Sequence, residues 1–150
     1  MRVAFDTSVL VAGLVEAHPD FARASLWLDA ADRGEVQAVW TIHAYAELWS
    51  VLTRLPLAER LEPTAVNELL AALVAAHPPE MLTCADYQAA SARCGRAGVR
   101  SGAIFDALHL VLAERMGADA LLTLNVKDFA RLSPQIRALP PPDTLALPQD

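Results

Sequence analysis

Short apolar runs separated by helical periodicity predict that strands and helices alternate along this chain. The apolar run at 2–5 ends in Asp-Thr-Ser, which predicts a strand followed at once by a helix start, because these residue types are good N-caps. A second apolar run at 36–40 predicts another strand. Three more strands are predicted at 80–84, at 118–124 and, along an edge, at 135–139.

Five longer segments carry the apolar spacing of helices, and glycine or proline marks where they end. Gly34 follows the first segment and Pro56 stops the second, since proline disfavours helical backbone in the residue before it. The predicted helices span residues 19–33, 41–55, 63–76, 85–97 and 101–117.

The alternation predicts an α/β fold with a central, mostly parallel sheet of four to five strands and helices on both faces. A chain of 150 residues without an internal repeat predicts one domain, at 1–139, followed by a proline-rich C-terminal tail at 140–150 that is extended or loosely attached. Ligands of such sheets bind beyond the carboxyl ends of the strands. Two acid-bearing turns, at Asp6 and at 125–128, fall at such ends.

Composition narrows the functional classes. An apolar fraction of 54% argues against disorder, while a net charge of −6 is the wrong sign for a general nucleic-acid binder unless metal ions, a local basic patch or a basic partner compensates. Cys84 and Cys94 lack the spacing of a zinc site, which favours the cytosol and reduced thiols. No apolar run approaches the ~20 residues of a membrane span, so no membrane association is expected.

Three acidic residues are candidates for a functional site, each with a plainer interpretation. Asp6 is a metal ligand at a strand end or an ordinary N-cap. Glu47 lies almost opposite the apolar stripe of its helix, so alone it reads as an exposed glutamate. Asp106 sits in a helix that is apolar on nearly every side, and a buried carboxylate is costly unless it is paired or metal-bound, which favours a site.

Polar residues near these acids are weaker candidates. His109 follows Asp106 by one turn on the same face, where it either touches a substrate or is a hydrogen-bonded, partly buried histidine, and we favour the second. Asn125 and Asp128 follow the strand at 118–124, where ordinary turn chemistry also explains them. The sequence contains neither a Gly-rich phosphate loop nor a GxSxG elbow, so no motif supports an NTPase or a serine hydrolase.

Four motifs taken together resemble the PIN-domain ribonucleases, in family order. Residues 3–10, VAFDTSVL, resemble the opening strand, and residues 44–48, AYAEL, resemble the helix with a lone glutamate. Residues 105–113, FDALHLVLA, look like the family's helix with the pattern D-A-L-I-A-A-x-A, and residues 122–129, LTLNVKDF, look like its strand-end signature T-x-N/D-x-x-D-F. Each motif alone is weak, whereas the ordered set is specific. The size of the chain resembles the VapC branch, the toxins of bacterial toxin–antitoxin pairs.

This resemblance implies a PIN-like fold and a Mg²⁺- or Mn²⁺-dependent endoribonuclease that cleaves RNA phosphodiester bonds. It also implies a cytoplasmic homodimer, with a small antitoxin protein as a second partner. Asp6 and Asp106 would hold the first ion, with Glu47 binding or positioning a water molecule. The fourth acidic position of the family is Asn125 here, which would hold a second metal less firmly. Residues expected to support the site or to contact substrate are Thr7, Ser8, Thr123, Asp128 and Arg100. Arg93, Arg96 and Arg100 lie near the start of the Asp106 helix, where they either guide the RNA backbone or form a solvated helix face.

Two rival functions stay open at the level of the sequence. The first is a catalytically weak PIN-like module that binds or regulates through RNA or a protein partner, which the neutral Asn125 would favour. The second is a phosphotransfer domain with Asp6 as the nucleophile. Ser8 occupies the place of the second aspartate of a D-x-D motif, which counts against the second rival.

Overall fold

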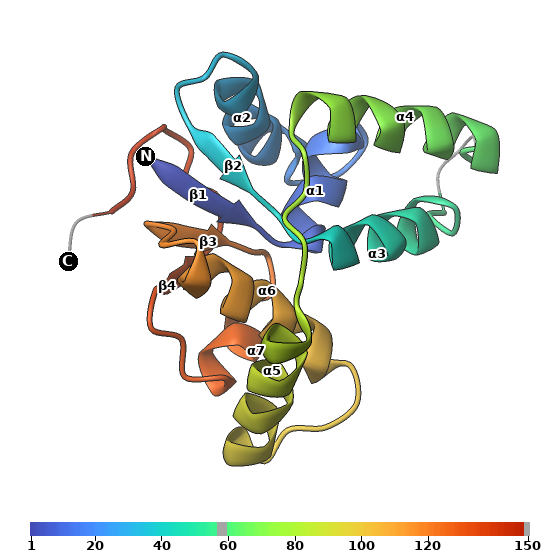
Figure 1. Ribbon diagram of the computed structural model, residues 1–150. Coiled ribbons are helices and arrows are strands. Elements are labelled where there is room, and N and C mark those ends of the chain that lie inside the picture. The colour runs from blue at the N-terminus through green and yellow to red at the C-terminus, as the bar shows by residue number, and fades with distance from the viewer. Residues whose placement is uncertain (57–59, 149–150) are drawn as a thin grey trace.

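The computed structural model describes residues 1–56 and 60–148, and within them a four-stranded parallel sheet organises the chain (Figure 1). The strand order is β2-β1-β3-β4, where β1 is Arg2–Phe5, β2 is Gln37–Val39, β3 is Ala120–Leu122 and β4 is Arg137–Leu139. The two central strands, β1 and β3, lie more than a hundred residues apart in the sequence, and their pairing aligns Phe5 with Leu122. All three pairings are parallel, so the carboxyl ends of the strands share one edge of the sheet.

Seven helices connect and cover these strands in the part of the chain that is described. Five of them begin and end close to the predicted positions, α1 confirms the predicted helix start after the first strand, and a short helix follows the third strand. Their bounds are α1 Thr7–Leu14, α2 Phe21–Asp32, α3 Ile42–Leu52, α4 Pro63–Ala76, α5 Cys84–Ala97, α6 Ala103–Arg115 and α7 Val126–Arg131.

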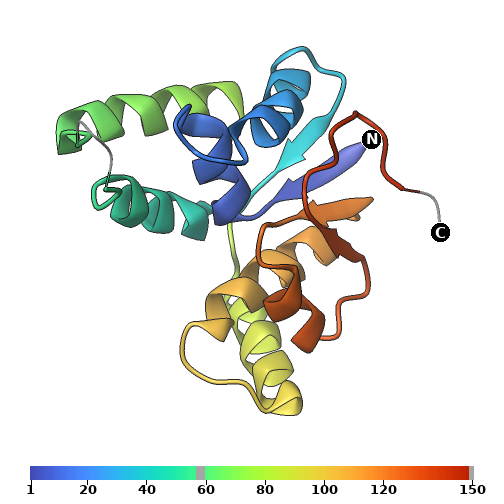
Figure 2. The same ribbon diagram turned by 180° about the vertical axis from the view of Figure 1, so that it is seen from behind.

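The helices divide between the two faces of the sheet, as Figures 1 and 2 show from opposite sides. Helices α1 to α4 share one apolar core, in which the fully buried Trp27 and Trp40 are the largest side chains. Helices α5 to α7 share a second core around Leu108 and Phe129. The predicted α/β fold, with a parallel sheet between layers of helices, is therefore confirmed.

One predicted element is wrong. The segment 80–84 forms no strand, because only a single parallel bridge joins Glu80 to Thr41. The backbone instead enters α5, whose first turn is fixed by a capping box between Thr83 and Asp86. The Thr83 hydroxyl accepts a hydrogen bond from the Asp86 N–H, and the Asp86 carboxylate accepts one from the Thr83 N–H, so these polar groups commit the segment to a helix start.

The C-terminal tail has no helix or strand through residue 148, yet it lies against the first core. The Trp27 indole N–H donates a hydrogen bond of 2.8 Å to the Pro142 carbonyl. Leu145 and Leu147 pack partly buried against the same core. The tail is thus attached to the core by specific contacts.

Candidate active site

The topology of the sheet brings Asp6 and Thr123 together. Asp6 follows β1 and Thr123 follows β3, and the Asp6 N–H donates a hydrogen bond of 3.0 Å to the Leu122 carbonyl. Because β1 and β3 are neighbouring parallel strands, the residues after them meet at one edge of the sheet. This is the edge at which α/β sheets bind their ligands.

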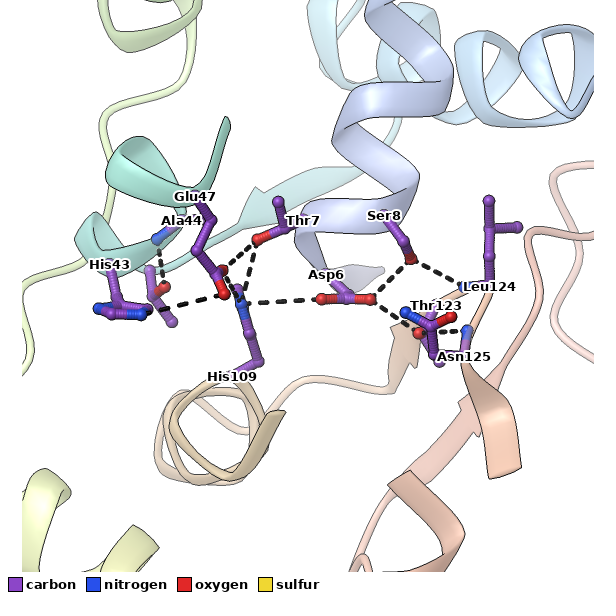
Figure 3. A network of polar contacts seen from close by, with 11 residues as sticks. Asp6, Thr7, Ser8, His43, Ala44, Glu47, His109, Thr123, Leu124 and Asn125 are labelled. Carbon is purple, nitrogen blue, oxygen red and sulfur yellow. Dashed lines mark hydrogen bonds and ion pairs between the residues drawn. The ribbon is translucent and has the colours of Figure 1, made fainter. Parts of the chain in front are cut away.

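Hydroxyl groups hold the Asp6 carboxylate in place (Figure 3). Asp6 is only 3% exposed, and its Oδ2 accepts hydrogen bonds from Ser8 Oγ at 2.7 Å and from Thr123 Oγ1 at 2.8 Å. Ser8 Oγ in turn accepts from the Leu124 N–H at 3.0 Å. The Asp6 side chain makes no cap hydrogen bond to α1, so the simple N-cap explanation does not account for its burial.

Glu47 reaches the same edge from α3 and is held by Thr7 and His109. Its Oε2 accepts a hydrogen bond from Thr7 Oγ1 and lies 2.9 Å from His109 Nε2, as Figure 3 shows. Thr7 Oγ1 and His109 Nε2 are themselves 3.2 Å apart. The Glu47 side chain is 23% exposed, which rules out a plain, fully solvated glutamate.

The protonation of this pair follows from its contacts. Burial would raise the pKa of Glu47, but the hydrogen bond and charge of His109, together with the Thr7 hydroxyl, hold this pKa below its ordinary value. Burial would lower the pKa of His109, but the hydrogen bond to Glu47 and the charges of Asp6, Glu47 and Asp106 raise it. These opposite shifts favour an ionised Glu47 carboxylate beside a protonated His109.

Asp106 is the exception among the acids. It lies in the first turn of α6, and within the described residues its carboxylate has no hydrogen-bond or ion-pair partner. Burial raises the pKa of Asp106 to about 6, with repulsion from Asp6 adding to the shift. The charges of Asp128 and Glu47 push this pKa in the same direction, while His109 opposes them. Four carboxylates thus act on one another here.

The strand-end segment supplies backbone contacts and one more charge. Asn125 is exposed, its N–H donates to Thr123 Oγ1 at 2.9 Å, and its side chain makes no cap bond to α7. Asp128 is exposed in the first turn of α7 and contributes to the raised pKa of Asp106. Asp128 is therefore the residue of this segment whose charge reaches the other acids.

The predicted arginine group separates into different roles. Arg93 forms a two-pronged ion pair with Glu114, at 2.9 and 2.6 Å, which ties α5 to α6 and leaves its charge compensated. Arg96 and Arg100 are both exposed, and Arg100 lies in the connection just before α6. Of these three arginines, Arg93 therefore has a structural role, whereas Arg96 and Arg100 stay available to the solvent side.

Two histidines that the sequence analysis left outside the site complete this network. His109, 3% exposed, is the hydrogen-bonded histidine that we favoured, but its partner Glu47 was not predicted. His43 Nε2 lies 3.9 Å from Glu47 Oε1 across one helical turn. Two spacings could have signalled this arrangement: His109 follows Asp106 by three residues, and Glu47 follows His43 by four.

The chemistry of these residues fits a hard divalent cation. All four acids offer oxygen donors, the type that Mg²⁺ and Mn²⁺ prefer. Burial, together with repulsion from the other acids, raises the pKa of Asp106, and a bound cation would stabilise its ionised form. Across residues 1–56 and 60–148, however, no group of three or more His, Cys, Asp or Glu side chains already surrounds a common metal position. Side-chain movement would have to accompany binding.

Comparison with known proteins places this chain in a family. The model of the PIN domain matches residues 3–133, which include all four acids and the sheet edge that holds them. The chain therefore belongs to the PIN domain family. The expected resemblance is confirmed.

Within that family the chain is homologous to VapC ribonucleases. It is 36% identical to ribonuclease VapC40 of Mycobacterium tuberculosis over 126 residues, which cover 83% of this chain and 87% of the relative. It is 35% identical to ribonuclease VapC27 of the same species over 127 residues, covering 84% of this chain and 88% of the relative. The predicted class of enzyme, a VapC-type ribonuclease, is thus confirmed.

Solved structures support the fold. VapC20 of Mycobacterium tuberculosis, described as a Sarcin-Ricin loop cleaving toxin, superposes with a TM-score of 0.67 at 19% identity, covering 85% of this chain and 93% of that one. VapBC2 of Rickettsia felis, bound to a DNA fragment from their promoter, gives 0.66 at 18% identity over 92% and 97% of the two chains. None of the described helices has both the length and the apolar character needed to cross a membrane.

Proposed function

We propose that this VapC homologue is a Mg²⁺- or Mn²⁺-dependent endoribonuclease and the toxin of a toxin–antitoxin pair, with Asp6, Glu47 and Asp106 as its catalytic acids. The observation that carries the proposal is the carboxylate of Asp106, which has no polar partner in the described chain and a pKa raised to about 6 by burial and by Asp6. Such a group destabilises the fold unless a cation uses it.

Asp6 and Asp106 are the residues that would hold the ion. When bound, a divalent cation neutralises charge on the scissile phosphate and lowers the pKa of the attacking water. Ser8 and Thr123 fix the orientation of the Asp6 carboxylate by donating to one of its oxygens, which leaves the other oxygen free of hydroxyl contacts. This division of labour resembles the way outer partners orient metal ligands in proteins.

Glu47 positions the attacking water. Because its pKa is held low, its carboxylate accepts a hydrogen bond from that water and aims the water oxygen at phosphorus. His109 and Thr7 restrict the carboxylate to one orientation, so little reorganisation is needed when RNA arrives. Asn125 and Asp128 border the site, with Asn125 offering a neutral oxygen and Asp128 a charge.

Two protein partners belong to this proposal. A small antitoxin with a basic segment suits a chain of net charge −6 whose acids converge at one edge, because an Arg side chain takes the place of a cation among carboxylates. A homodimer is the second expected assembly. Co-expression with the product of a neighbouring gene, followed by light scattering of the purified complex, measures both.

The catalytic proposal is tested with purified protein and a structured RNA. One reaction contains Mn²⁺ at about millimolar concentration, and a parallel reaction contains EDTA. Cleavage in Mn²⁺ that EDTA abolishes is the expected result. Asp6→Asn and Asp106→Asn are expected to remove cleavage, whereas Asp29→Asn, an exposed acid on α2, keeps it. Circular dichroism of each variant confirms that the fold is retained.

The opposite results are equally informative. Full activity in either Asp6→Asn or Asp106→Asn refutes the proposed acids. RNA that is bound with measurable affinity but never cleaved, at any metal concentration, points instead to the non-catalytic binding module.

A further inference from the structure

A pocket of about 370 Å³ opens directly beside Glu47 and is not used by the chemistry described so far. Its volume is within the range of small-molecule sites in proteins. Helices α3 and α6 and the start of α1 contribute its walls. The lining residues are Thr7, His43, Ala46, Glu47, Ser50, Val51, Arg54 and Phe105.

An aromatic pair forms one wall of this pocket. The rings of His43 and Phe105 are stacked, with centroids 4.9 Å apart and an angle of 26° between their planes. Phe105 is 44% exposed, although phenylalanine is among the residue types most often fully buried. His43 stacks on one face of the Phe105 ring, and the rest of the ring contributes exposed apolar area to the pocket.

The pocket is continuous with the catalytic edge. Thr7 and Glu47, which are joined by a hydrogen bond, belong to both. Phe105 directly precedes Asp106 in the chain, so it is carried by the same helical turn as a proposed metal ligand. On the far side Arg54 is exposed, and its Nε donates to the Ser50 carbonyl, which leaves its terminal nitrogens for an anion.

We propose that this pocket binds a nucleobase of the RNA next to the scissile phosphate, with the base stacked on Phe105 and the adjoining phosphate contacting Arg54. The inference rests on the proposed ribonuclease function. Unpaired RNA bases stack on exposed aromatic rings, and arginine binds phosphate oxygens, so the two groups fit one nucleotide of a single strand.

The experiment uses the full chain with Asp6→Asn to prevent cleavage. The probe is a mixed-sequence, single-stranded RNA of about twelve nucleotides, labelled with 2-aminopurine at each position in turn, since quenching of this base reports stacking. One position is expected to be quenched with Phe105 and with Phe105→Tyr, but not with Phe105→Leu. Affinity should fall roughly tenfold for Phe105→Leu, the effect typical of one lost stacked base.

Two controls make the reading specific. Tyr87→Leu removes an aromatic ring of equal exposure, 45%, on α5 and outside this pocket, and it should change neither quenching nor affinity. An RNA that is abasic at the quenched position removes the base with no change to the protein. It should bind the parent protein about tenfold more weakly, yet lose nothing further with Phe105→Leu, because the two changes remove the same contact.

Each remaining outcome contradicts the inference in its own way. Equal quenching and affinity for Phe105 and Phe105→Leu in the Asp6→Asn chain, when the chain with Asp6 intact cleaves RNA, overturn the nucleobase site alone. RNA that the chain neither binds nor cleaves overturns the ribonuclease function and this site with it. If light scattering shows that Phe105→Leu splits a dimer, Phe105 lies between two copies of the chain and the nucleobase site is overturned.

Discussion

Glu47 and Asp106 face the same edge of one sheet, but the protein treats the two carboxylates in opposite ways. Glu47 has its hydrogen bonds from Thr7 and His109 in place, and its pKa is lowered. Asp106 has no polar partner in the part of the chain described, and its pKa is raised to about 6. One half of the site is organised by the protein itself, while the other half depends on a cation.

Asp6 lies between these halves and shares in both. Its Oδ2 is held by two hydroxyl groups, while its charge raises the pKa of Asp106. A site in which every acid was compensated in this way would have little affinity for a metal ion. One uncompensated acid leaves repulsion between carboxylates in the metal-free protein. A cation that binds there relieves this repulsion and so binds more tightly.

The largest effect is expected from removing the uncompensated acid. Asp106→Asn should lower RNA cleavage by more than the roughly 10- to 100-fold typical of residues that only orient a metal ligand. The protein should stay folded, because this carboxylate makes no hydrogen bond or ion pair with other described residues. Initial cleavage rates in saturating Mn²⁺ provide the measurement, and a loss below tenfold would contradict the role of Asp106.

Disturbing the compensated half should have the next largest effect. His109→Phe keeps a ring in the buried position but removes the contact to Glu47, so cleavage should fall roughly 10- to 100-fold. His109→Gln, which retains an N–H donor, should recover part of the loss. The pH–rate profile is the decisive readout: without His109 the pKa of Glu47 rises, so the acid limb should move to higher pH.

A control separates this effect from a general loss of histidine. His18→Gln alters a histidine that contacts Asp20 at a distance from the acids, and its profile should match that of the parent protein. An unchanged acid limb in a folded His109→Phe protein would show that His109 has only a packing role.

The metal-free protein should also reveal the difference through the pH dependence of its stability. The folded chain holds the Asp106 proton up to a pKa of about 6, against an ordinary value of 3.8 in the unfolded chain. The native state therefore binds more protons than the unfolded state between these values, and its stability falls as pH rises from about 4 to 6. Asp106→Asn lacks this penalty.

The melting temperature of Asp106→Asn in EDTA should accordingly exceed that of the parent protein by a few degrees at pH 7.5. The gap should close as pH is lowered below about 4, where both side chains are neutral. Millimolar Mn²⁺ should reverse the order at pH 7.5, since only the parent protein gains from binding. A constant gap at all pH values would show that the pKa of Asp106 is not raised in the folded protein.

Sequence patterns predicted the fold well because its elements carry local signals. Apolar runs and helix stops predicted the parallel sheet. The strand predicted at 80–84 is absent, because the Thr83–Asp86 capping box starts a helix there. The site was harder to predict. The contact between Asp6 and Thr123 joins residues 117 positions apart, and it exists only because β1 and β3 are neighbours, which no local pattern encodes.

The sequence identified the three acids, but it did not show that their environments differ. Glu47 looked the most exposed of the three, yet its partners Thr7 and His109 come from α1 and α6, which no periodicity within α3 could reveal. Asp106 looked buried, and its isolation from polar partners emerges only when the surrounding helices are in place. Such long-range pairings are therefore where structure adds most.

The smallest effects are expected at the border of the uncompensated half, where Asn125 and Asp128 compete for the role of fourth ligand. We favoured Asn125 from the family signature, whereas the structure gives Asp128 the charge that acts on Asp106. Asn125→Ala should reduce cleavage by less than Asp106→Ala does, because a neutral oxygen binds a hard cation more weakly than a carboxylate. Asn125→Asp should retain or tighten Mn²⁺ binding, whereas Asp128→Asn should weaken it modestly. Calorimetric titration of the three variants with Mn²⁺ ranks the two positions, and weaker binding by a well-folded Asn125→Asp protein would show that residue 125 does not face the metal, leaving Asp128 as the group that completes the site.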